Sequence, residues 1–154
     1  MKQFNPNTFV CESISYNELL NVIYNLNNSK SSSVDNFSNL LLKQCKFELL
    51  EPLLHIFNLS FSQGIFPTKL KCAKVIPLFK SVDPFSLTNY RPISLLSPFA
   101  KLLEILMTSR IRPFLTKFNI IYDYQFGFRK GYSTKFALLD VVNLLKMNLI
   151  IISK

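Results

Sequence analysis

The chain has 154 residues, 49% of them hydrophobic and 14% aromatic, and a formal net charge of +9 at pH 7. This length allows one domain with a buried core at most, and the apolar content excludes an intrinsically disordered chain. Residues 1–7 contain no apolar signal segment, and no run approaches the roughly 18 apolar residues of a membrane span. We therefore expect a soluble protein of the nucleus or cytoplasm with no membrane contact.

The positive charge is confined to the second half of the chain. Residues 1–70 are electrically balanced, whereas residues 71–154 hold 13 of the 18 Lys and Arg and only four carboxylates. Clustered cations attract polyanions, so the charge predicts nucleic acid as partner. On charge alone, a solvated basic face or an anionic membrane surface is equally consistent. We accordingly divide the chain into a helical segment, 1–70, and a basic region, 71–154.

The cysteines and the single histidine offer little chemistry. Cys11, Cys45 and Cys72 are odd in number and form no Cys-x-x-Cys pair, so neither a disulfide framework nor a zinc site is expected. They are interpreted as reduced, partly buried thiols. His55 lies in an apolar stretch, where a core or helix-surface role is favoured over acid–base catalysis.

Residues 1–70 predict three helices. Ser15 and Glu18 form a capping-box pattern before a helix over about 16–27. Two further helices, 38–50 and 52–63, are expected to be separated at Pro52, and Gly64 is expected to end the second.

The basic region predicts a hairpin followed by two helices. Residues 74–80 have the β-branched content of a strand, with Pro77 favouring a sheet edge, and 93–96 is the second strand. Ser97 followed by Pro98 is typical of a helix start, and that helix could bend at Pro113. A final helix is expected from Ser133 or Thr134 to Leu149. The predicted fold is thus α+β, mostly helical, with a small antiparallel β-hairpin.

Two segments contain candidate binding residues. Lys80 and Arg91 lie on the two arms of the predicted hairpin, where an ammonium and a guanidinium could hold a triphosphate between them. Lys74, on the same strand as Lys80, is a weaker candidate. The alternative is that Arg91 only anchors a turn through backbone carbonyls.

The second segment, residues 125–131, has the sequence Gln-Phe-Gly-Phe-Arg-Lys-Gly. Glycine permits close backbone approach, aromatic rings can stack on bases, and Arg129 and Lys130 can neutralise phosphates. The alternative places Phe126 and Phe128 in the core and leaves the two cations merely exposed; for the two phenylalanines we favour it.

Residues 89–96, Asn-Tyr-Arg-Pro-Ile-Ser-Leu-Leu, and residues 125–134 together resemble the fingers region of reverse transcriptases, most closely those of non-LTR, jockey-like retrotransposons. The resemblance runs from about Lys30 to Asp140. Ser33, Asn36 and Val82 depart from the small residues or glycines usual in this family.

This resemblance implies that Lys80 and Arg91, with Lys74 more weakly, bind the incoming nucleotide. It further implies that four residues contact an RNA or DNA template–primer: Arg129, Lys130, Ser133 and Thr134. No catalytic or metal-binding residue is assigned, because the metal-binding aspartates of the family lie beyond the helix that carries Asp140. We therefore expect no polymerase activity from this chain alone, and Mg²⁺ as a cofactor only of a complete polymerase.

Three interpretations remain open at this stage. The first is a truncated reverse transcriptase domain that binds template–primer and nucleotide, with the remainder of the polymerase as a further partner. The second is a stand-alone nucleic-acid-binding protein derived from it. The third is a nonfunctional remnant whose apolar surface, including residues 149–152, is uncovered.

Overall fold

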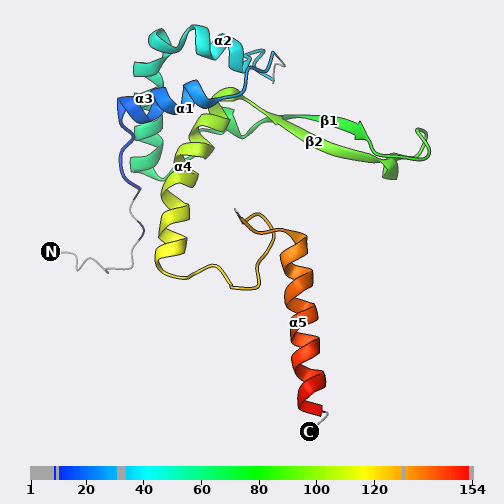
Figure 1. Ribbon diagram of the computed structural model, residues 1–154. Helices are drawn as coiled ribbons and strands as arrows, with labels where there is room; N and C mark the ends of the chain where they lie inside the picture. Colours follow the sequence, from blue (N-terminus) through cyan, green and yellow to red (C-terminus); the bar gives the residue numbers. More distant parts are fainter. Residues whose placement is uncertain (1–8, 10, 31–33, 130, 153–154) are drawn as a thin grey trace, which may run out of the picture. The chain divides into compact units, whose positions relative to one another are not determined.

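The computed structural model describes residues 9, 11–30, 34–129 and 131–152, with side chains described as far as Lys146. Five α-helices and one two-stranded antiparallel sheet are present in this part of the chain, which confirms the mostly helical α+β prediction (Figure 1). The elements in chain order are α1 (Tyr16–Asn25), α2 (Asn39–Gln44), α3 (Lys46–Gln63), the 3₁₀ helix η1 (Thr68–Lys71), β1 (Ala73–Phe79), the 3₁₀ helix η2 (Leu87–Asn89), β2 (Tyr90–Leu96), α4 (Pro98–Lys117) and α5 (Thr134–Ile152). The chain divides into two compact units, 1–112 and 113–154.

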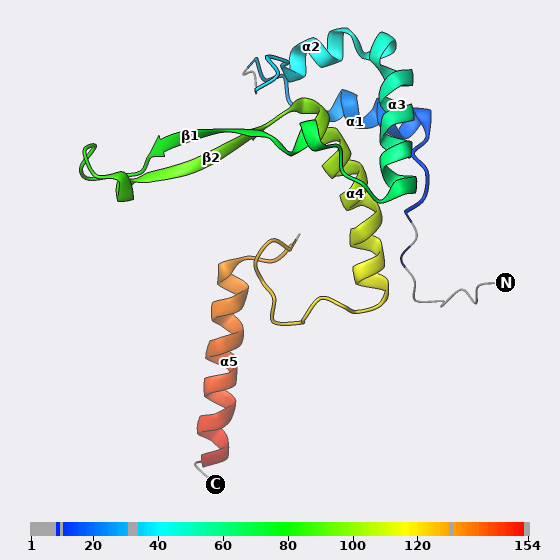
Figure 2. The same cartoon turned by 180° about the vertical axis from the view of Figure 1, so that it is seen from behind.

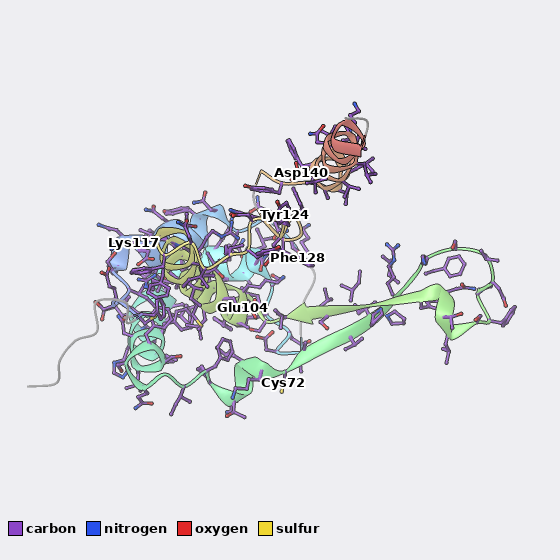
Figure 3. All side chains as sticks on the ribbon, turned by 90° about the horizontal axis from the view of Figure 1, so that it is seen from below. Cys72, Glu104, Lys117, Tyr124, Phe128 and Asp140 are labelled. Carbon is purple, nitrogen blue, oxygen red and sulfur yellow. The ribbon has the colours of Figure 1, made fainter. Side chains whose placement is uncertain are left out.

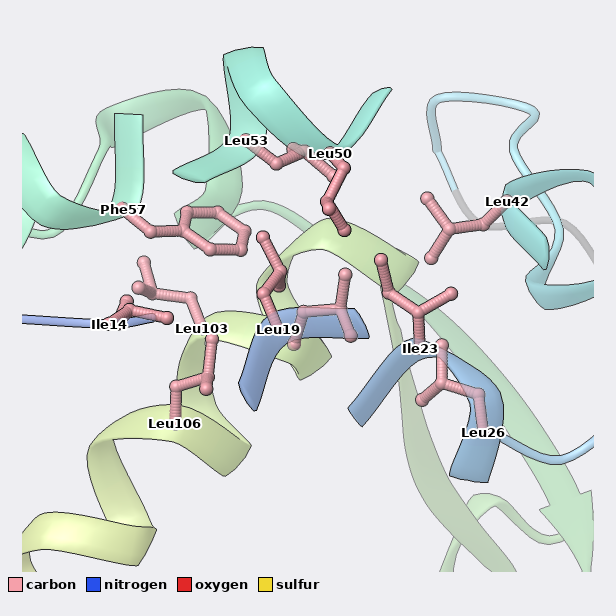
Figure 4. Close-up of a cluster of buried hydrophobic side chains, with 11 residues drawn as sticks. Ile14, Leu19, Ile23, Leu26, Leu42, Leu50, Leu53, Phe57, Leu103 and Leu106 are labelled. Carbon is pink, nitrogen blue, oxygen red and sulfur yellow. The ribbon is translucent and has the colours of Figure 1, made fainter. Parts of the chain in front are cut away.

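The core of the first unit lies between α1, α2, α3 and the first half of α4 (Figure 4). Figures 1 and 2 show these helices gathered together, with the hairpin extending away from them. Each buried leucine or phenylalanine side chain contributes roughly 1.5–3 kcal/mol through its removal from water. The most deeply buried side chains are Leu19, Ile23, Leu42, Leu50, Phe57, Leu102, Leu103 and Leu106.

Three helix ends lie where local signals predicted them. The Ser15 hydroxyl accepts a hydrogen bond from the Glu18 amide at 3.2 Å, which confirms the predicted cap of α1. Gly64 ends α3 in the left-handed conformation, with φ +67°, and its N–H donates to the Ser60 carbonyl. Ser97 precedes α4, and its carbonyl accepts from the Lys101 amide at 3.0 Å.

The predicted break at Pro52 is wrong, because α3 runs through this residue and the interruption falls at Cys45 instead. A proline inside a helix costs about 3 kcal/mol through one lost hydrogen bond and a steric clash. Leu50, Leu53 and Phe57 all face the core from α3, and keeping them there in one continuous helix outweighs that cost. Pro113 likewise lies inside α4, which continues to Lys117.

Arg110 ties α4 to the chain segment that leads into α1. Its guanidinium makes a two-pronged ion pair with the Glu18 carboxylate, at 2.7 and 2.8 Å. It also donates to the backbone carbonyls of Glu12, Ser13 and Leu106. The hydrogen bonds that Arg110 donates to the Glu18 carboxylate lower the pKa of Glu18 below its ordinary value, since they favour the charged form.

The hairpin accommodates a proline on each strand. Pro77 lies directly opposite Pro92. Three residues further along, the backbone amide of Lys80 donates to the Asn89 carbonyl at 2.7 Å. Hydrogen-bonded and non-hydrogen-bonded pairs alternate in an antiparallel ladder, so the two prolines occupy a non-bonded pair and remove no ladder hydrogen bond. Because proline has no N–H, the outer edge of each strand also lacks a hydrogen-bond donor at Pro77 and Pro92. This discourages pairing with another strand.

The tip of the hairpin contains a strained residue. Val82 has φ +78°, a conformation that a β-branched side chain rarely adopts. Such strain costs about 1–3 kcal/mol. Around it, Asp83 accepts from the Phe85 amide, and the Tyr90 hydroxyl donates to the Pro84 carbonyl.

Replacing Val82 by glycine is therefore expected to stabilise the hairpin. Hydrogen exchange of the Lys80 amide should slow by about fivefold, which corresponds to roughly 1 kcal/mol. Leu87→Gly is the matched control, because Leu87 is also exposed at the tip but has no positive φ; it should leave exchange unchanged or speed it. Faster exchange in Val82→Gly would contradict the assignment of strain.

Candidate nucleic-acid and nucleotide interface

The strand register places Lys74, Lys80 and Arg91 on one face of the hairpin. Leu78 pairs with Arg91 and Lys74 with Leu95, and residues two apart on a strand share a face. Lys80 and Arg91 are thus diagonal neighbours, with Cβ atoms somewhat less than roughly 7–8 Å apart. All three cations are exposed, and none has a carboxylate partner among the described residues. The face can therefore present an ammonium and a guanidinium to one anion.

Lys74 lies at the opposite end of this face. Six residues of extended chain separate it from Lys80, or roughly 20 Å along the strand. The exposed aliphatic side chains of Ile76, Leu78 and Ile93 lie between. A triphosphate held between Lys80 and Arg91 is shorter than this separation, so the structure does not bring Lys74 to the same triphosphate.

The loop before α5, in the second unit, holds the other predicted contacts. The Arg129 guanidinium lies over the Tyr132 ring at 4.3 Å, and Tyr132 in turn meets Phe126 edge-on at 5.8 Å. Ser133 is exposed and lies directly before α5, where its carbonyl accepts from the Phe136 and Ala137 amides; α5 then begins at the exposed Thr134. Lys130 lies outside the described residues.

The two phenylalanines of this loop differ in their surroundings. Phe126 is half-buried against Tyr132, whereas Phe128 is fully exposed (Figure 3). The core assignment of Phe128 is therefore wrong. Its backbone has φ +58°, a conformation that a bulky side chain rarely adopts.

Other chemistry is sparse in the described part of the chain. No group of three or more His, Cys, Asp or Glu side chains there could hold a metal ion. Cys11 and Cys45 are half-buried, Cys72 is exposed, and no disulfide joins them. His55 is exposed on α3, and no described helix is long and apolar enough to cross a membrane.

The sequence matches polymerases of mobile elements. It is 37% identical over 122 residues to a probable RNA-directed DNA polymerase from transposon BS of Drosophila melanogaster, covering 79% of this chain and 14% of that protein. It is 31% identical over 131 residues to the RNA-directed DNA polymerase from mobile element jockey of the same species, covering 84% and 14%. This chain is homologous to a segment of the reverse transcriptases of non-LTR retrotransposons.

The homologous segment is short relative to these proteins. The probable polymerase of the X-element from Drosophila melanogaster is 31% identical over 118 residues, which are 76% of this chain and 13% of that protein. The chain thus spans about a seventh of the length of these curated relatives. No protein-family model matches it.

The structure links two segments of this reverse transcriptase region that are far apart in sequence. The Asp35 carboxylate accepts hydrogen bonds from the Ser97 hydroxyl and the Phe37 amide, which fixes the loop before α2 against the start of α4. Asn36 has φ +57°, a conformation that asparagine tolerates better than most residues. Ser33 lies outside the described residues.

Sequence reasoning missed Arg110 and the exposure of Phe128. Arg110 lies 92 residues from Glu18, and a short-range sequence pattern does not predict an ion pair between residues so far apart. Phe128 follows Gly127 in a segment rich in rings, and hydrophobicity alone favours burial for both of its phenylalanines. The adjacent glycine was the one signal that the backbone there could turn sharply.

Proposed function

We propose that this chain is the nucleic-acid-gripping part of a non-LTR reverse transcriptase. In this proposal the loop and helix start at residues 129–134 bind template–primer, Lys80 and Arg91 bind the triphosphate of a nucleotide, and the chain alone has no polymerase activity. The observation that supports it most is the shared, exposed face of Lys80 and Arg91, which have no carboxylate among the described residues to neutralise them.

The charge of the chain supports the same function. Phosphate contacts dominate nucleic-acid affinity through counterion release, and the net charge of +9 is located in the region that contains both candidate segments. A compartment that contains nucleic acid, nuclear or cytoplasmic, is part of the proposal. The printed names of the relatives specify RNA-directed DNA polymerases, which makes RNA the template of choice for a test.

A partner for α5 belongs to the proposal as well. Apolar side chains point to solvent from several sides of this helix, and such a helix is usually buried. We propose that the remainder of a polymerase covers them, since the relatives are much longer than this chain. The exposed apolar residues of α5 are Phe136, Leu138, Leu139, Val141, Val142, Leu144 and Leu145.

Binding to a primed RNA template tests the proposal. Arg129→Ala combined with Lys130→Ala is expected to weaken binding roughly 10- to 100-fold at low salt, because two phosphate contacts are lost. The matched control is Lys43→Ala with Lys46→Ala, which removes the same charge from α2 and α3. Equal weakening by both double variants would show that only overall charge matters and would overturn the proposed site.

A further inference from the structure

The loop between α4 and α5 displays aromatic rings to solvent. Tyr122 and Tyr124 are exposed and lie against each other, with ring centroids 5.4 Å apart. Phe128 is the extreme case, because its exposed fraction is 106%, as large as that of an isolated residue. Figure 3 labels Tyr124 and Phe128 on this loop. Burial therefore does not explain why a large apolar ring occupies position 128.

The backbone at Phe128 makes that exposure costly. A bulky residue at φ +58° costs about 1–3 kcal/mol relative to a relaxed conformation. Glycine would adopt this conformation without strain. Among the described residues, no ring contact of Phe128 offsets the strain. A strained, exposed aromatic side chain is better explained by a ligand than by folding.

The next residue supplies a cation. The guanidinium of Arg129 rests on the Tyr132 ring, and its buried Nη1 has no hydrogen-bond acceptor among the described residues. Arg129 as a whole is half-exposed, and a phosphate oxygen is the acceptor with which a guanidinium pairs most strongly. An aromatic ring followed directly by such a donor matches the alternation of base and phosphate along a nucleic-acid strand.

We infer that Phe128 stacks on an unpaired base of single-stranded nucleic acid while Arg129 binds an adjacent phosphate. The inference rests on the proposed function and extends it from backbone contacts to base contacts. Only unpaired bases offer a free face to the ring, so the site prefers a single strand to a duplex. Every base has such a face, so the site has little sequence preference.

A single-stranded oligonucleotide carrying the fluorescent base 2-aminopurine tests the inference, because stacking on an aromatic ring quenches this base. Phe128→Ala is expected to weaken binding about 5- to 100-fold and to abolish the quenching. The salt dependence should be unchanged, because no charge is lost, whereas Arg129→Ala should reduce it. Phe128→Trp should restore both binding and quenching.

Phe85→Ala is the matched control, because Phe85 is 95% exposed and lies on the hairpin tip, in the first unit. It should bind like the unmodified chain. Binding by Phe128→Leu at full strength, or equal losses from Phe85→Ala and Phe128→Ala, would overturn the stacking site. Reduced self-association of Phe128→Ala with unchanged oligonucleotide binding would also overturn it, in favour of a protein contact. Failure of the unmodified chain to bind any oligonucleotide would instead refute the proposed function.

Discussion

Replacing Arg110 by alanine is expected to destabilise the first unit by about 2–4 kcal/mol. The substitution removes a two-pronged ion pair with Glu18 and three hydrogen bonds to backbone carbonyls, and it leaves the Glu18 carboxylate without its cation. The Arg110 side chain is only 11% exposed, so water replaces few of these contacts. The free energy of unfolding, measured with urea by circular dichroism, tests the prediction.

Two variants separate the causes of this loss. Arg110→Lys keeps the charge but not the planar fork of donors, so it should recover only a small part of the stability. Glu104→Gln removes a carboxylate from an exposed position on the same helix (Figure 3) and should cost less than about 0.5 kcal/mol. Loss of less than about 1 kcal/mol in Arg110→Ala would contradict the role assigned to Arg110.

The same ion pair makes stability depend on pH. Hydrogen bonds from Arg110 lower the pKa of Glu18 below its ordinary value of 4.5. A carboxyl group with a lowered pKa stabilises the folded state above that ordinary value, and this contribution disappears as pH falls through the folded-state value. Glu18→Gln should therefore show a smaller loss of stability on acidification below pH 4.5 than the unmodified chain does.

Replacing both hairpin cations, in Lys80→Ala with Arg91→Ala, is expected to lower the affinity for a nucleoside triphosphate by roughly 100-fold or more. Charge-assisted hydrogen bonds contribute about 1.5–3 kcal/mol each, and both partners of the triphosphate are removed. Equilibrium dialysis with a labelled triphosphate measures the change. A monophosphate should bind weakly to both chains, because it offers less charge to the two cations.

Lys69→Ala with Lys71→Ala is the control for this experiment. Both residues are exposed on η1, in the same unit, and the pair carries the same charge as Lys80 and Arg91. The control should retain most of the triphosphate affinity. If the two double variants behave alike, the hairpin face has no specific role and Arg91 only anchors its turn.

Features coded by a few adjacent residues were predictable from the sequence. Ser15, Gly64 and the Ser97-Pro98 pair set helix ends through their own side chains or backbone preferences, and each lies where it was expected. The hairpin was also expected, although β2 begins at Tyr90, earlier than residue 93. Local chemistry determines these features, so sequence reasoning reaches them.

Features that depend on distant contacts were not predictable in this way. Pro52 would break an isolated helix, but packing of α3 in the core keeps it continuous. The partnership of Arg110 with Glu18 joins residues 92 positions apart. Phe128 was assigned to the core because hydrophobicity does not reveal the left-handed backbone conformation at this position. The roles of the individual binding residues remain predictions that binding experiments must test.

The most direct test of the central claim is the salt dependence of affinity for a primed RNA template. Each phosphate contact adds roughly −0.7 to −0.9 to the slope of log affinity against log salt concentration. The proposed function predicts a slope of about −3 or steeper for the unmodified chain, reduced by about 1.5 in Arg129→Ala with Lys130→Ala. A slope near zero, or one that this double variant leaves unchanged, would contradict it.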